Sequence, residues 1–109
     1  MSIQTTDRES AAVAVAPRVS LSDIEAAIKA RYDTNADTAV GDDVPKVAEL
    51  KLLSICILVM TNGFVVIGKS APASPQNFDA ALGRKFAYED AIRQLWPLMG
   101  FALRDKLAA

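Results

Sequence analysis

The sequence predicts an α+β fold in which a β-hairpin forms a small antiparallel sheet, packs against a long helix and a C-terminal helix, and belongs to an oligomer. Apolar and β-branched runs flank the pair Asn62-Gly63, which is the strongest short-range mark of a hairpin. Residues 78–96 then repeat apolar side chains at helical spacing. Both faces of the hairpin are apolar, which indicates a sheet that needs cover on both sides.

Length and composition favour a single domain and exclude several classes of function. A chain of 109 residues fits one domain, and 12 Lys and Arg against 13 Asp and Glu give a net charge of −1. This balance lacks the basic footprint that a nucleic acid polymer requires. Cys56 is the only cysteine and histidine is absent, which excludes a disulfide framework, a zinc site of the usual Cys/His type and a histidine-based catalytic dyad within one chain. The usual enzymatic apparatus is thus mostly missing, and we expect no enzyme, no metal and no cofactor.

Two apolar runs raise the question of a membrane or export segment. The longer run, residues 52–60, is interrupted by Ser54 and is too short to span a bilayer. Residues 11–16 are shorter than a signal-peptide core and follow Asp7, Arg8 and Glu9 instead of a basic region. We therefore expect a protein of the reducing cytoplasm that does not insert into membranes.

The N-terminal third contains one predicted helix. Residues 1–19 mix small and polar types without a period, which predicts a disordered arm, and residues 20–109 form the single α+β domain. Ser20 with Asp23 resembles a capping box, and apolar residues then recur at helical spacing, which predicts a helix over residues 21–32.

The acidic stretch over residues 33–45 reads as a loop. It lacks periodicity and contains Gly41 and Pro45. Its aspartates suggest calcium, but their spacing does not match an EF-hand loop. A solvated loop is the favoured interpretation.

The hairpin is predicted over residues 50–71. A two-residue loop places Thr61 opposite Phe64, with Asn62 and Gly63 both at positive φ in a type I′ turn. The register that follows pairs Met60 with Val65, Val59 with Val66, Leu58 with Ile67 and Ile57 with Gly68.

Two helices are predicted after the hairpin. Ser74 is a suitable cap and Pro75 suits a first helical position, so the long helix is predicted over residues 75–95. Pro97 removes a backbone hydrogen bond, which predicts a kink or a new start and a last helix over residues 97–107.

The long helix places charges within its apolar side. Winding it as a helix groups Phe78, Leu82, Phe86, Ile92 and Trp96 in one stripe, and Lys85, Glu89 and Arg93 fall inside the stripe at spacings of four. In one interpretation these charges form a surface ladder of weak pairs. In the other, the hairpin and a second subunit cover the helix, and its charges pair or meet a ligand. Arginine forks would suit phosphate, and Phe64, Phe78 or Tyr88 would suit a purine ring, although core packing also explains the aromatic residues.

Four motifs resemble a family of small bacteriophage proteins named after gp forty-nine of one phage and gene sixty-six of another. They are "NGF" at 62–64, "SPQNFD" at 74–79, "GRKFA" at 83–87 and "LWPLMGF" at 95–101. The family is similar to phage inhibitors of the Thoeris antiviral system, which sequester a cyclic ADP-ribose signal, and related proteins hold cyclic dinucleotides between subunits. The sequence departs from the family pattern at Tyr88, where an arginine or another polar residue is usual, and at Asp90, where an asparagine is usual.

The resemblance implies an anti-defence protein of the host cytoplasm that captures a cyclic nucleotide without turnover. The ligand-binding residues it implies are Phe64, Asn77, Arg84, Tyr88, Glu89 and Arg93. The partners are then the cyclic nucleotide and further copies of the chain, in a dimer or a higher homo-oligomer. The alternative is an oligomeric phage protein that binds a host or phage protein through its apolar surface. An enzyme that uses Glu89 or Asp90 with Lys85 is a third and weaker candidate.

Overall fold

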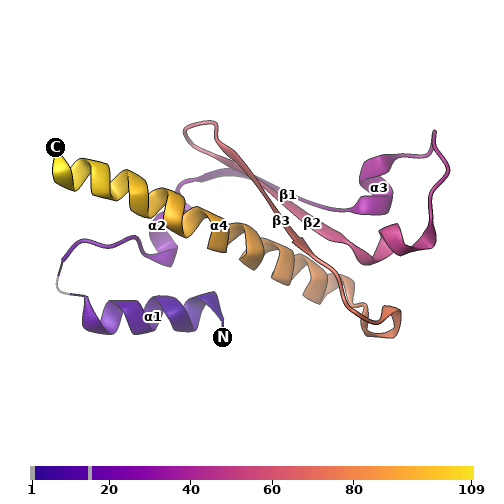
Figure 1. Ribbon diagram of the computed structural model, residues 1–109, viewed down its shortest axis with the longest axis horizontal. Coiled ribbons are helices and arrows are strands. Elements are labelled where there is room, and N and C mark those ends of the chain that lie inside the picture. The colour runs from indigo at the N-terminus through magenta and orange to yellow at the C-terminus, as the bar shows by residue number, and fades with distance from the viewer. Residues whose placement is uncertain (1, 15) are drawn as a thin grey trace.

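The protein folds as a three-stranded antiparallel sheet with one long helix across one face. The computed structural model describes residues 2–14 and 16–109. The strands β1 (Ile28–Asn35), β2 (Ser54–Met60) and β3 (Val65–Ser70) lie in the order β1-β2-β3. Helix α4 (Ala80–Ala108) crosses the sheet and extends beyond it (Figure 1). The predicted α+β class, with an antiparallel sheet on a long helix, is confirmed.

The hairpin turn contains three residues and not the predicted two. The Met60 N–H donates to the Phe64 carbonyl over 2.8 Å, and the Gly63 N–H donates to the Met60 carbonyl over 2.9 Å. Gly63 has a φ of 89°, while no non-glycine residue in the described part of the chain has a positive φ. The type I′ prediction is therefore wrong. The Asn62 side chain accepts the Phe64 N–H over 2.9 Å, which stabilises the alternative turn locally.

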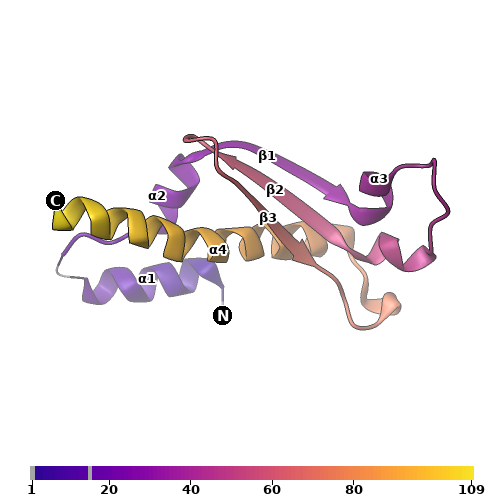
Figure 2. The same cartoon turned by 45° about the horizontal axis from the view of Figure 1, so that its top comes forward.

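The longer turn shifts the strand pairing by one residue. Val59 lies opposite Val65, and Ile57 lies opposite Ile67, so the predicted register is wrong. The face toward α4 carries the buried residues of the hairpin, namely Ser54, Cys56, Leu58, Met60, Val66 and Gly68. The opposite face, called the open face below, carries Ala30, Tyr32, Thr34, Ile55, Ile57, Val59, Val65, Ile67 and Lys69. Figure 2 shows that no helix lies over this open face.

The predicted helix over residues 21–32 ends early. Helix α2 (Leu21–Ala26) has the predicted capping box of Ser20 and Asp23, but β1 begins at Ile28. Residues 28–34 alternate apolar or neutral side chains with charged ones at Lys29, Arg31 and Asp33. This period of two is typical of a strand, and pairing with β2 fixes it.

The predicted disordered arm contains a helix. Helix α1 (Ile3–Val13) is capped by the Ser2 side chain, which accepts the Thr5 N–H over 3.1 Å. Ile3 is 3% exposed and joins the hydrophobic core. Burial of this side chain holds the helix against the domain. The arm prediction also covers residues 1 and 15, which lie outside the described residues.

The acidic stretch forms part of β1, a short helix and a loop. Helix α3 (Ala36–Val40) is capped by Asn35, whose side chain accepts the Asp37 N–H. The Lys46 ammonium lies 3.5 Å from the Asp37 carboxylate and 3.0 Å from that of Asp42. Two of the aspartates in this stretch are therefore paired with a lysine.

Helix α4 is a single helix, and neither predicted boundary holds. Ser74 and Pro75 lead only into a 3₁₀ turn, Pro75–Asn77, and Asp79 caps α4 by accepting the Leu82 N–H over 3.0 Å. Pro97 lies inside the helix on its exposed side. A proline there removes one hydrogen bond, and water can satisfy the freed carbonyl, so the helix continues.

Small residues bring α4 close to the sheet. A Cβ added at Gly68 would overlap the Ala87 carbonyl oxygen and lie 2.9 Å from the Ala91 Cβ. Ala87, Ala91, Ile92 and Leu95 form the buried apolar side of α4. The predicted stripe of large residues is therefore only partly right, since Ile92 is buried but Leu82 and Phe86 are each 48% exposed.

Candidate functional site

A cleft of about 580 Å³ lies beneath the hairpin tip. The C-terminal half of α4 forms its apolar floor through Leu95, Leu98, Met99, Ala102 and Leu103. The hairpin tip contributes Thr61, Asn62 and Phe64, and the remaining polar lining comes from Arg18, Asp23 and Lys106. Its volume lies in the range of small-molecule sites, which combine an apolar lining with a few polar groups.

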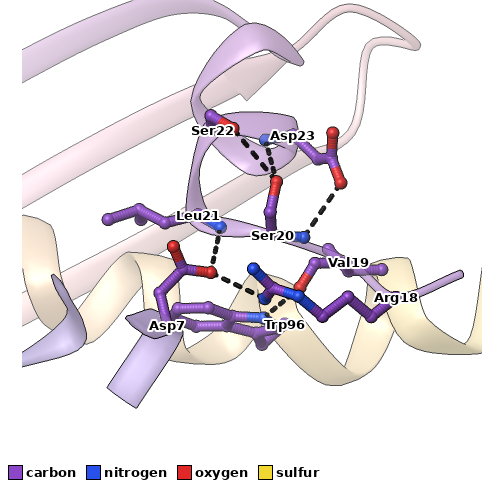
Figure 3. A network of polar contacts seen from close by, with 8 residues as sticks. All are labelled: Asp7, Arg18, Val19, Ser20, Leu21, Ser22, Asp23 and Trp96. Carbon is purple, nitrogen blue, oxygen red and sulfur yellow. Dashed lines mark hydrogen bonds and ion pairs between the residues drawn. The ribbon is translucent and has the colours of Figure 1, made fainter. Parts of the chain in front are cut away.

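The wall of the cleft beside α2 is fixed by the hydrogen bonds shown in Figure 3. Asp7 of α1 accepts from the Arg18 guanidinium over 2.8 Å and from the Leu21 N–H over 2.9 Å. The Arg18 hydrogen bond, followed by that from Leu21, lowers the pKa of the Asp7 carboxyl. The Trp96 indole N–H of α4 donates to the Val19 carbonyl over 3.0 Å. These contacts join α1, α4 and residues 18–21 into one wall.

The charged side chains of the cleft differ in whether they already bind other residues of the chain. The Asp23 carboxylate accepts the Ser20 N–H over 2.9 Å as part of the capping box, and this hydrogen bond is the main cause of its lowered pKa. Arg18 is paired with Asp7. Lys106 makes no ion pair with any residue of 2–14 or 16–109. Lys106 is therefore the cation best placed to meet an anion in the cleft.

A second hollow of about 180 Å³ lies at the other end of the hairpin. Its walls include Ser54 and Ser70 at the far ends of β2 and β3, and Phe78, Leu82 and Phe86 near the start of α4. It is smaller than typical ligand sites and offers no basic side chain in its lining. This chemistry does not favour a phosphate.

The structure does not bring the six residues implied by the resemblance into one site. Phe64 lines the cleft and is 52% exposed, whereas Asn77 lines the second hollow. Arg84 and Arg93 are exposed and line neither. Within one chain, only Phe64 of this set reaches the main cleft.

Tyr88 belongs to a polar cluster between α4, α2 and β1. Its hydroxyl donates to the Glu25 carboxylate over 3.1 Å, and the Arg31 guanidinium lies 4.2 Å from its ring centroid. Burial, with the adjacent Glu25 charge, raises the pKa of Tyr88 to about 12. Arg31 also contacts Asp33 over 3.1 Å. The ring is thus held by a cation and a carboxylate, and the face toward Arg31 is not free for a base.

Glu89 is buried and does not join the expected charge ladder. It is 6% exposed, and its Oε2 has no hydrogen-bond partner among the described residues. Lys85 and Arg93 are exposed, and no ion pair joins either to Glu89 within residues 2–14 and 16–109. The surface-ladder interpretation is therefore wrong for this chain.

Sequence reasoning missed Arg18 and Lys106. Neither residue belongs to one of the sequence motifs, and Arg18 lies in the predicted disordered arm of residues 1–19. One signal was present, because Leu95, Met99 and Lys106 lie on one side of a helix that continues through Pro97. The predicted break at Pro97 concealed it.

The structure is that of a small α+β protein with a cleft between the hairpin tip and the C-terminal half of α4. A family model described as "Phage protein (N4 Gp49/phage Sf6 gene 66) family" matches residues 19–107. The chain therefore belongs to this family of phage proteins. No curated protein and no solved structure matches it.

Two further observations concern metal ions and membranes. Among the described residues, no group of three or more cysteine, aspartate and glutamate side chains is placed to hold a metal ion. No helix in that part of the chain is long and apolar enough to cross a bilayer.

Proposed function

We propose that this phage protein is a non-enzymatic binding protein that captures a cyclic nucleotide signal of host immunity in the cytoplasm of the host. The signal would be a cyclic ADP-ribose isomer or a cyclic dinucleotide. The observation that carries the proposal is the cleft beneath the hairpin tip, which combines an apolar floor, the exposed ring of Phe64 and the cation Lys106.

The chemistry of the cleft matches the parts of such a ligand. A purine ring can stack on Phe64 and cover the apolar floor provided by Leu98 and Met99. The Lys106 ammonium supplies a charge for phosphate, and the Asn62 side chain supplies polar groups at the rim. No hydrolysis is required in this role, because capture alone lowers the concentration of free signal.

The resemblance implies capture at a subunit interface and would add Arg84 and Arg93 to the site. Both arginines are exposed and would be available to a ligand held between two chains. If the ligand binds in the cleft, its affinity should depend on Lys106. If it binds at the interface, its affinity should depend on Arg84 and Arg93.

Calorimetric titration with cyclic ADP-ribose isomers and cyclic dinucleotides tests the proposal. If the cleft binds, Phe64→Ala and Lys106→Gln should each weaken binding by about ten- to a hundredfold, the value of a lost stacking or charge-assisted contact of roughly 1.5 to 3 kcal/mol. Lys51→Gln, at an exposed lysine that lines neither hollow, is the matched control. A loss confined to Arg84→Ala and Arg93→Ala would move the site to the interface, and no binding by the parent would refute capture.

A second candidate function is the binding of a host or phage protein through the open face of the sheet. The supporting observation is the exposure of Val65 and Ile67, which are 50% and 55% exposed on a face whose centre carries no charge. If the parent binds no nucleotide but Ile67→Lys abolishes a measured association, the interaction function is favoured. Capture is favoured if Ile67→Lys leaves nucleotide binding unchanged.

A further inference from the structure

The two edges of the sheet differ in how their backbone groups are satisfied. At the β3 edge, the Asp90 carboxylate accepts the Lys69 N–H over 2.9 Å, and the Gln94 amide donates to the Ile67 carbonyl over 2.7 Å. Side chains of α4 therefore occupy groups that a further strand would need. At the β1 edge, no described residue bonds to an outward-facing backbone group of residues 30–34. Figure 2 shows β1 at the outer edge of the sheet, with no further strand of the described chain beyond it.

The pairing of β1 with β2 identifies the unsatisfied groups. The Ala36 N–H donates to the Leu53 carbonyl over 2.9 Å at the end of the ladder. Hydrogen-bonded pairs alternate along an antiparallel ladder, so Tyr32, opposite Ile57, also directs its N–H and C=O toward β2. Arg31 and Asp33 then direct theirs outward. Each chain presents two N–H and two C=O groups with no partner in the described part of the chain.

We propose that this edge binds a second copy of the chain, β1 against β1, around a two-fold axis at Tyr32. The two sheets would join into one antiparallel sheet of six strands. Arg31 would lie opposite the partner's Asp33, and Asp33 opposite the partner's Arg31. Four interchain backbone hydrogen bonds would form between these residues, using every outward group identified above.

Charge and local geometry select this register. If the two strands were shifted by two residues in one direction, Arg31 would lie opposite Arg31 of the other copy. A shift by two residues in the other direction would place Asp33 opposite Asp33. Like charges directly opposite each other are destabilising. A shift of one residue would put the open face of one sheet on the same side as the α4-covered face of the other. The two open faces would then no longer form one continuous surface. The bulge between Ile28 and Ala30 ends the regular part of β1, and residues 30–34 are centred on Tyr32.

Tyr32 supplies the apolar contact at the axis. Its side chain is 60% exposed on the open face. In the proposed pair it meets the partner's Tyr32 at a non-hydrogen-bonded position, where Cα atoms approach to about 4.5 Å and side chains are closest. An aromatic pair at such a site stabilises a sheet beyond its hydrogen bonds.

Charge reversal with mixing tests the interface. The parent should show twice the 11.7 kDa chain mass by light scattering, with association at micromolar concentration because edge pairing buries a modest area. Arg31→Asp alone and Asp33→Arg alone place like charges opposite each other, and each should lower the dimer affinity by at least tenfold. An equimolar mixture of the two variants should restore the dimer, since every opposing pair is again of opposite charge. The intrachain contact of Arg31 with Asp33 cannot account for rescue by mixing.

Cross-linking tests the position of the axis directly. Tyr32→Cys places two thiols opposite each other, so mild oxidation should give a covalent dimer. Thr34→Cys is the matched control, because the two thiols would lie about 13 Å apart along the strands. The native Cys56 is 0% exposed and does not compete. A parent that stays monomeric up to about 200 μM, no rescue on mixing, or equal cross-linking of both variants would each overturn the proposal.

Discussion

The two faces of the sheet contain similarly apolar residues but meet different surroundings. On the covered face, Cys56 and Leu58 are 0% exposed, and Gly68 lies against α4. On the open face, Val65 and Ile67 remain about half exposed, at 50% and 55%. The difference lies in side-chain size and not in hydrophobicity. A helix packs closely where Gly68 meets Ala87 and Ala91. On the open face, β2 and β3 instead present mainly branched Ile and Val side chains, and no helix of the described chain packs on them.

The largest expected effect comes from removing a large side chain from the covered face. Leu58→Ala should lower the free energy of unfolding by about 2 to 5 kcal/mol, because it removes buried methyl groups and leaves a cavity beneath α4. Chemical denaturation measures the change. Ile57→Ala, one residue along β2 and facing the opposite side, is the matched control and should cost less. Equal losses would mean that both faces are covered in solution.

The close approach of α4 gives the next effect. Gly68→Ala introduces a methyl group that overlaps the Ala87 carbonyl oxygen, so the helix must shift, at a cost of about 1 to 3 kcal/mol. Gly100→Ala is the matched control within α4, since a Cβ there has no other residue within 4 Å. That change should stabilise the protein by about 0.5 to 1 kcal/mol through the lower entropy of the unfolded chain. If both substitutions stabilise the protein, α4 does not pack on Gly68.

The sequence predicts the hairpin and the long helix, but neither the register nor the helix face. Every position of β2 after Ser54 is apolar, so no alternation favours one pairing over the next. Gly68 determines which face of the sheet α4 covers, because α4 can approach closely only on the face that contains this glycine. There the Ala87 carbonyl oxygen lies where a Cβ of any other residue would be. A tertiary contact of this kind leaves no periodic signal in a single strand. In contrast, β1 does have a local signal, because charged and uncharged side chains alternate over residues 28–34. The predicted helix over residues 21–32 does not take this alternation into account.

The candidate site was less predictable than the fold. Phe64 follows from the hairpin motif, but the cleft it lines is formed by segments distant in sequence, including Arg18 and Lys106. Their proximity depends on α4 continuing through Pro97 and on the network that joins Asp7 to Arg18. Neither feature produces a local sequence pattern, so the cleft could be found only in three dimensions.

The smallest expected effect lies on the open face and tests whether that face is free. Ile67→Thr keeps a β-branched side chain in β3 and removes apolar surface that is already 55% exposed, so the free energy of unfolding should change by less than about 0.5 kcal/mol. Denaturation at a low and a high protein concentration measures this change. A loss above about 1 kcal/mol that grows with concentration would show that copies of the chain cover the face, because association stabilises the folded state by mass action. A large loss independent of concentration would mean that residues of the same chain cover it, and the contrast between the two faces would then be wrong.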